Sequence, residues 1–153
     1  MRAIEPWVEA PLRSFLAESG ARVVLLTTSA GQVLAQHGFT RSLDVMSAAA
    51  LGAGIVASTR ELGNTMGETS LGAVVHQGAR AGIFLAPFDT TRGRWIALVV
   101  FGAETSLGLV QLFFGRFVSD LAVAAPVDAP QPAVLAEDFE RDLNASLRSL
   151  FGR

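Results

Sequence analysis

Two short stretches of the sequence, residues 23–26 and 96–101, are almost uninterrupted runs of apolar residues. The first reads VVLL and the second IALVVF. A strand with one face in water alternates apolar and polar side chains, whereas a strand that is covered on both faces has no need of polar positions. The two runs therefore predict a sheet that carries a layer of structure on each side.

Apolar residues at helical spacing predict the covering layers. The three predicted helices cover residues 8–19, 42–66 and 106–125. Gly20 and Gly67 are suited to end the first two, because glycine readily takes the left-handed conformation of a helix C-cap. For the long central helix we expect Thr40 or Ser42 as the N-cap and Asp44 in the first turn, where an acidic side chain is favourable.

Between the helices lie segments rich in β-branched and aromatic residues, which favour strands. The five predicted strands cover residues 22–28, 32–37, 73–77, 82–88 and 95–101. The first two form a hairpin around Gly31, and the last three form a meander. The order of elements predicts an α/β fold of three layers, α/β/α, with a five-stranded, mainly antiparallel sheet. The long helix covers one face, and the other two helices cover the opposite face.

The composition changes after residue 125. At 153 residues the chain is long enough for about one domain, which we assign to residues 1–125. Residues 126–133 are rich in proline and predict a semi-extended linker. Residues 134–153 predict an amphipathic helix, which either packs permanently on the domain or stays mobile until a partner offers a groove. Its apolar stripe consists of Leu135, Phe139, Leu143, Leu147 and Leu150.

Charge and composition exclude several classes of protein. The formal net charge of −2 lacks the positive excess of nucleic-acid-binding proteins. The chain has no cysteine, and all 12 basic residues are arginine, so thiol chemistry, cysteine-ligated zinc and the Walker lysine are absent. Residues 1–7 show no signal-peptide core, and the longest small or apolar run, residues 47–58, is shorter than the roughly 20 residues that span a bilayer. We expect a cytoplasmic protein without membrane insertion.

The sequence offers no pattern typical of an active site. His37 and His76 stand in no metal-ligand spacing, and both are expected to be structural or surface residues. No G-x-S-x-G motif is present, and the glycines of the long helix do not lie between a strand and a helix start, as a dinucleotide site requires. We therefore predict no catalytic, cofactor-binding or metal-binding residues.

The long helix carries two different apolar stripes. The large residues Leu43, Leu51, Ile55 and Leu62 form one, which we expect to face the sheet; the second is formed mainly by small residues, Met46, Ala49, Ala50, Ala53 and Ala57. Glycine within a helix costs about 1 kcal/mol relative to alanine, so Gly52 and Gly54 need compensation from a closely packed backbone. The small stripe either lies tightly on the chain's own sheet or, as we favour, forms an interface with a partner.

Taken together, four sequence strings and their order resemble the Roadblock / dynein light-chain family and, within it, the bacterial MglB type. They are GARVVLLTTSAGQVLA at 20–35, LGNTMGE at 62–68, VHQG at 75–78 and ETSLGLVQL at 104–112. The resemblance covers roughly residues 8–125, and the helix after the proline-rich linker also looks MglB-like. It implies a dimer that serves as a platform for a small Ras-like GTPase of the MglA type.

The resemblance also implies which residues serve this role. Strands pair across the twofold axis of a homodimer and the long helices lie side by side, which assigns the dimer interface to Ala73, Val74, Val75, His76, Gln77, Met46 and Ala50. The GTPase-binding residues carried over are Ala49, Ala53, Ala57, Arg60 and Asn64. The apolar residues of the C-terminal helix are implied to contact the GTPase.

The MglB type is implied to be a GTPase-activating protein, in bacterial polarity and gliding motility, that reshapes the switch regions of the GTPase without an arginine finger. We expect accordingly that none of Arg60, Arg80, Arg92 and Arg94 acts as a finger, whose loss would cost 10³ to 10⁵ in rate. The alternative is a Roadblock scaffold that dimerises and docks partners without stimulating hydrolysis. The C-terminal helix favours the activator, because a minimal scaffold would not need it.

Overall fold

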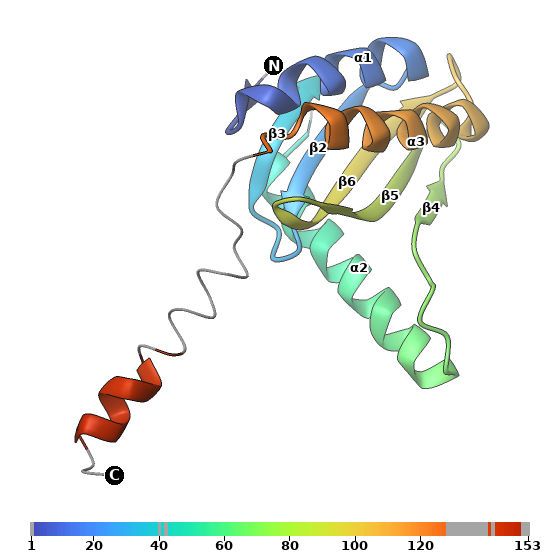
Figure 1. Cartoon of the computed structure of the whole chain (residues 1–153). Coiled ribbons are helices and arrows are strands. Elements are labelled where there is room, and N and C mark those ends of the chain that lie inside the picture. Colours follow the sequence, from blue (N-terminus) through green and yellow to red (C-terminus); the bar gives the residue numbers. More distant parts are fainter. Residues whose placement is uncertain (1, 40, 42, 128–140, 142, 151–153) are drawn as a thin grey trace.

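The computed structural model describes residues 2–39, 41, 43–127, 141 and 143–150. The described residues up to 127 form an α/β domain around one sheet (Figure 1). The strands are β1 (Arg2–Ala3), β2 (Val23–Thr28), β3 (Val33–Gly38), β4 (Val74–Gln77), β5 (Ala81–Thr90) and β6 (Gly93–Gly102). Their order across the sheet is β1-β3-β2-β6-β5-β4. Every neighbouring pair is antiparallel. All five predicted strands are present, and the two-residue β1 is an addition that is too short to show a periodic pattern.

The helices follow the predicted order. They are the 3-10 turn η1 (Pro6–Val8), α1 (Glu9–Ser19), α2 (Val45–Met66) and α3 (Leu107–Ala124). Gly20 and Gly67 end α1 and α2 with φ angles of 73° and 71°, as predicted. The predicted N-cap of α2 is wrong: Asp44 is the cap, and its carboxylate accepts hydrogen bonds from the Ser47 backbone N at 3.1 Å and Oγ at 2.8 Å.

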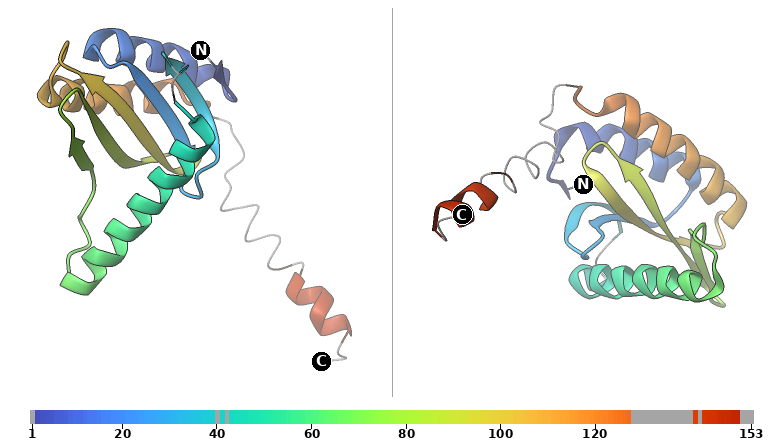
Figure 2. Two further views of the ribbon diagram at one scale, coloured as in Figure 1. Left: turned by 180° about the vertical axis from the view of Figure 1, so that it is seen from behind. Right: turned by 60° about the horizontal axis from the view of Figure 1, so that its bottom comes forward.

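The three predicted layers are confirmed. Helices α1 and α3 lie side by side on one face of the sheet, and α2 lies on the other face (Figure 2). The two central strands, β2 and β6, pair from Val23 with Val100 to Thr28 with Trp95. Both faces of these two strands are covered. The side chains of β2 from Val23 to Leu26 are therefore all buried. This is the physical reason for the continuous apolar runs.

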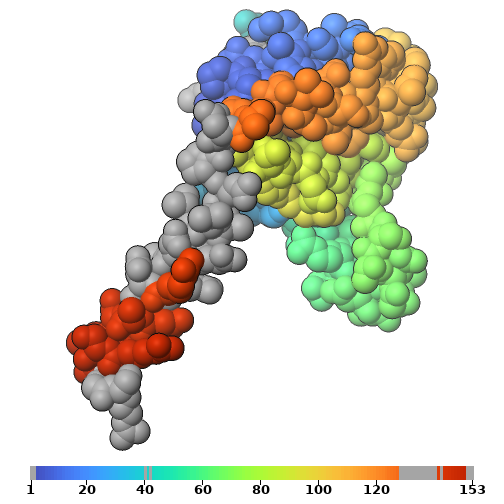
Figure 3. All heavy atoms as spheres, in the orientation of Figure 1, coloured from blue at the N-terminus to red at the C-terminus, as the bar shows by residue number. Residues whose placement is uncertain are grey.

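Two hydrophobic clusters fill the space between the layers. The cluster under α1 and α3 is aromatic, and Phe114 packs against Phe84 and Phe88 with ring centroids 5.3 and 5.5 Å apart. The cluster under α2 is aliphatic and smaller; its buried residues are Val23, Leu25, Ala53, Val56, Leu85, Ile96 and Leu98. The C-terminal half of α2 and the chain after it project from the body of the domain (Figure 3).

Helix α3 has the length and composition that could cross a bilayer, with a mean hydropathy of 1.5 over Leu107–Ala124. In this fold one side of the helix packs against the sheet: Val110, Phe114, Phe117 and Leu121 are buried in the aromatic cluster.

Candidate partner-docking surface

Helix α2 turns three of its small residues, Ala49, Gly52 and Ala53, toward the sheet. Ala49 and Val56 are 2% and 7% exposed, and a methyl group added to Gly52 would meet Leu98 Cδ1 at 3.3 Å. Ala53, at 9% exposure, belongs to the same buried set. This close packing on the chain's own sheet is the first of the two explanations that we gave for the small stripe. It accounts for Gly52 in the middle of the helix. The close packing expected at Gly54 is not found among the described residues, because a methyl group added there would meet nothing within 4 Å.

The predicted orientation of the two stripes is therefore wrong in part, because each stripe is split between the two sides of the helix. Leu43 packs against the cluster under α2, as expected, and Met46 and Ala50 of the small stripe are exposed, as expected. Leu51 and Leu62, which were expected to face the sheet, are 69% and 58% exposed. Ala49 and Ala53, assigned to the GTPase-binding surface, are in the core and offer no surface to a partner, whereas Ala57 is exposed. Sequence hydrophobicity cannot separate the two stripes, because a core and an interface both reward burial of apolar side chains.

The exposed face of α2 forms an apolar groove with strand β4. The groove has a volume of about 540 Å³ and is lined by Ala50, Leu51, Gly54, Ile55, Ser58, Thr59, Leu62, Val74 and His76. The structure thus brings together three residues that the resemblance assigned to the dimer interface: Ala50, Val74 and His76. Met46 is 71% exposed but lines a different hollow, together with Ile4 and Val45.

Strand β4 is the last strand of the sheet. It pairs with β5 on one side, from Val74 with Leu85 to Gln77 with Gly82, and its other side has no strand beside it in the described chain. Val75 is 37% exposed, and Ala73, His76 and Gln77 are also exposed. An unpaired edge of this kind is a template for pairing with another strand.

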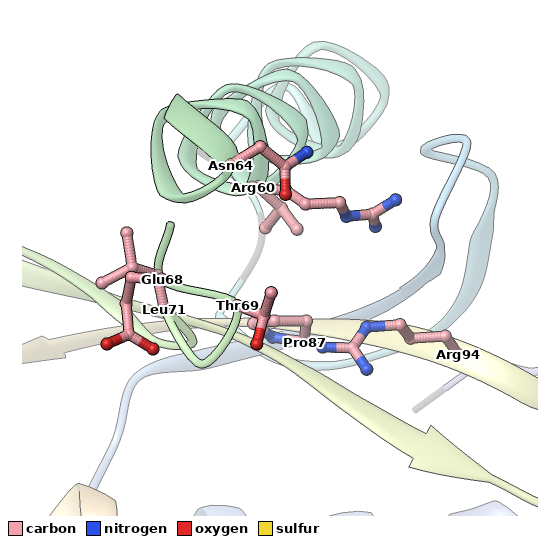
Figure 4. A pocket seen from close by; sticks show the side chains of 8 residues that line it. Arg60, Asn64, Glu68, Thr69, Leu71, Pro87 and Arg94 are labelled. Atoms are coloured by element: carbon pink, nitrogen blue, oxygen red, sulfur yellow. The ribbon is translucent and has the colours of Figure 1, made fainter. Parts of the chain in front are cut away.

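A second hollow lies on the polar side of α2 and has a volume of about 330 Å³. It lies between the C-terminal half of α2, the segment that follows it, and strands β5 and β6 near their connecting turn (Figure 4). We call it the arginine cleft; its lining residues are Val56, Arg60, Asn64, Glu68, Thr69, Leu71, Pro87 and Arg94. Arg60 and Asn64, which the resemblance assigned to GTPase binding, both line this cleft and are exposed.

The only acidic residue among those lining the cleft is occupied elsewhere. The Glu68 carboxylate accepts hydrogen bonds from the Ser70 hydroxyl and, at 2.9 Å, from the Ser70 backbone N–H. The hydroxyl bond above all, with the backbone bond, lowers the pKa of Glu68 below its ordinary value. In Figure 4 this carboxylate points away from the guanidinium groups of Arg60 and Arg94. The cleft is therefore lined mainly by hydrogen-bond donors on its polar side.

The four weighed arginines have different surroundings. Arg92 pairs with Glu5 at 3.5 Å, and Arg94 with Asp89 at 3.1 Å. Arg80 is exposed at the turn before β5. Arg60 forms no ion pair within the described part of the chain. Sequence reasoning did not anticipate that Arg60 and Arg94 share a cleft, since no local pattern relates residues 34 positions apart.

The histidines occupy the expected kinds of position. His37 is half-buried, its Nδ1 is buried without a hydrogen-bond partner, and burial lowers the pKa of its imidazole. His76 is exposed on β4. Among the described residues, no group of three or more acidic or histidine side chains could hold a metal ion.

Part of the C-terminal stripe can be placed. Residues 143–150 are helical, and Leu143, Leu147 and Leu150 are 47%, 42% and 77% exposed. Leu135 and Phe139 lie outside the described residues, as does most of the predicted linker. The roles assigned to this helix therefore stay predictions.

Comparison with known proteins places these features in context. The model of the Roadblock/LC7 domain family matches residues 8–91. MglB of Myxococcus xanthus is 28% identical with a TM-score of 0.71, over 78% of this chain and 95% of that one. The gliding protein MglB from Thermus thermophilus is 30% identical with a TM-score of 0.67, over 78% and 88%. An MglB with a tetrameric arrangement is 27% identical with a TM-score of 0.67, over 82% and 97%. No curated protein sequence matches the chain significantly.

Proposed function

The chain belongs to the Roadblock/LC7 family, and we propose that it is a homodimeric regulator of a small Ras-like GTPase of the MglA type. Within this proposal it acts as a GTPase-activating protein with no active site of its own. We also propose that it works in the cytoplasm, recruited to a cell pole, in the control of cell polarity or gliding motility.

One observation carries the proposal: large apolar side chains of α2 are exposed beside an edge of β4 that no strand of the described chain pairs with. Leu51, Leu62 and Met66 are each more than half exposed, and they border the groove with β4 or extend the same face of the helix. Exposed apolar side chains that gather into a patch typically mark an interaction surface. Pairing of β4 with its copy would satisfy the open edge, and the two α2 helices would cover each other's apolar stripes.

The similarity to MglB supports the choice of a GTPase as the partner. The match extends over most of this chain and nearly all of the Myxococcus xanthus protein. Self-association is in keeping with the tetrameric arrangement of one MglB relative. The activation mechanism, in which the switch regions of the GTPase are reshaped, is our inference from this likeness.

The experiment that tests the function is GTP turnover of the cognate Ras-like GTPase with and without this protein. We expect faster hydrolysis together with direct binding. Binding without acceleration would favour the alternative, a scaffold that docks partners and leaves hydrolysis unchanged. The absence of binding to the GTPase would contradict both forms of the proposal.

The absence of an arginine finger has a separate test. We expect Arg60→Ala to raise the concentration needed for activation, while the maximal rate at saturation falls far less than the roughly 10³-fold loss that a finger implies. Arg80→Ala and Arg92→Ala are matched variants of two of the other three weighed arginines. Single-turnover hydrolysis at saturating protein separates binding from rate, and a thousandfold loss for one arginine with binding intact would disprove the mechanism.

A further inference from the structure

The arginine cleft has the chemistry of a site for an oxygen anion. Arg60 extends from α2 and Arg94 from β6, and Thr69 lines the same cleft (Figure 4). Asn64 adds an amide one helical turn after Arg60. Guanidinium groups present several N–H donors in a planar fork that matches the two oxygens of a carboxylate.

The positive charge of this cleft is available to a partner. Arg60 has no ion-pair partner in the described part of the chain. Among the described residues Arg94 forms an ion pair only with Asp89, and the two side chains are 46% and 82% exposed. An exposed pair of this kind contributes about 0–1 kcal/mol, so Arg94 can exchange Asp89 for another acidic group at little cost. Glu68 does not compete, because Ser70 holds its carboxylate.

The cleft also stays open in the proposed dimer. Successive residues of an α-helix are rotated by about 100°, which places Arg60 and Asn64 on a flank of α2 different from that of Leu51 and Leu62. The groove that includes β4 contains Leu51 and Leu62, and the cleft contains Arg60 and Asn64. A dimer built through β4 and the apolar stripe therefore leaves the arginines accessible.

We infer that the cleft receives the carboxylate of an aspartate or glutamate on the surface of the docked GTPase, held between Arg60 and Arg94. This inference rests on the proposed function and adds to it a second anchor, Arg94, and the chemistry of the group that is bound. The anchor is polar and lies beside an apolar contact surface, so it sets the orientation of the partner.

A protein carboxylate fits the cleft better than a free small anion. Arg94 and its surroundings are largely open to water, where a single ion pair is weak. A carboxylate that belongs to a protein already held at α2 binds at a high effective concentration, which compensates for this weakness. A free anion has no such advantage.

The test compares Arg60→Ala, Arg94→Ala and the double variant with Arg116→Ala as the matched control. Arg116 is an exposed arginine on α3, on the opposite face of the sheet, where it pairs with Glu18 at 3.2 Å. Calorimetry with the cognate GTPase, loaded with a non-hydrolysable GTP analogue, measures the dissociation constant.

We expect each cleft variant to weaken binding of the GTPase roughly tenfold. The double variant is expected to weaken it by less than the product of the two single losses, since both arginines hold one group. The control changes binding less than twofold, and added salt weakens wild-type binding more than that of the double variant.

Different results separate the two proposals. If the wild-type protein binds no Ras-like GTPase, the proposed function and this inference both fail. If the wild type binds and the double variant binds equally tightly, only the inference is overturned. The same holds if Arg116→Ala loses as much affinity for the GTPase as the cleft variants do. Inorganic phosphate is the probe for a free anion, and saturable binding to the wild-type dimer below about 1 mM would contradict the assignment to a protein carboxylate.

Discussion

On one face of the sheet, helices α1 and α3 turn aromatic side chains such as Phe15 and Phe117 into the core; on the other face, α2 turns Ala49 and Ala53 inward and leaves Leu51 and Leu62 outside. The first layer buries its largest side chains, the aromatic residues Phe15, Phe114 and Phe117, within the chain, although Leu112 on α3 stays 65% exposed. The second layer holds its helix close to the sheet through small residues and keeps its large ones for another surface. A helix can thus be apolar on two sides for two different reasons, and only one of them is the chain's own core.

The difference between the two sides of α2 predicts the largest effect. Ala53→Glu places a charge without a partner in the aliphatic cluster and is expected to lower the free energy of unfolding by roughly 2–4 kcal/mol. Ala57→Glu adds the same group at an exposed position of the same helix and is expected to change it by no more than about 0.5 kcal/mol. Urea unfolding of both variants measures the contrast. Equal losses of unfolding free energy would contradict the placement of Ala53 in the core and of Ala57 at the surface.

The outward face of α2 predicts the next effect. Leu62→Asp puts a charge into the proposed dimer interface and is expected to weaken self-association by roughly 30-fold or more. Leu112→Asp is the matched control, since Leu112 is 65% exposed on α3 compared with 58% for Leu62. Light scattering over a dilution series measures the mass of both variants. A wild-type protein that is monomeric at tens of micromolar, or a dimer that tolerates Leu62→Asp, would contradict the proposal that this face of α2 is the dimer interface.

Truncation after Ala125 tests whether the C-terminal helix belongs to the domain or to the complex. We expect an unchanged melting temperature and an unchanged dimer, because both packed layers lie before this point. Affinity for the GTPase, or the rate of nucleotide exchange, is expected to change by roughly tenfold, which corresponds to about 1.4 kcal/mol. A truncated protein that is less stable but regulates the GTPase normally would show instead that the helix braces the domain.

The smallest effect concerns the start of α2. Hydrogen bonds from the Ser47 backbone and hydroxyl lower the pKa of the Asp44 carboxyl. Since the folded protein holds this proton less tightly than the unfolded chain, the stabilisation is complete above about pH 4 and is lost as the pH falls through the lower folded value. Asp44→Asn keeps a capping oxygen that does not titrate. Thermal unfolding between about pH 5 and pH 3 should therefore show a slightly shallower decline for the variant, and parallel declines would exclude Asp44 as a source of acid sensitivity.

The local patterns of the sequence were sufficient for most of the elements. The runs at 23–26 and 96–101 have no polar positions, so a covered sheet was the remaining choice, and the glycines at 20 and 67 end helices because their backbone takes a positive φ. The N-cap of α2 was missed because threonine, serine and aspartate all supply a capping oxygen. Choosing among them depends on where the chain turns, which the sequence does not show.

Tertiary structure alone decided which side of α2 is the core. Both of its stripes are apolar, and hydrophobicity rewards burial equally against a sheet or against a partner. The distance between helix and sheet, set by Gly52 under Leu98 and by the packing of Val56, placed Ala49 and Ala53 inside and left Met46, Ala50 and Ala57 of the small stripe outside. The meeting of Arg60 and Arg94 likewise depends on how α2 crosses the sheet, because a contact between distant residues follows from the path of the backbone and leaves no periodic trace in the sequence.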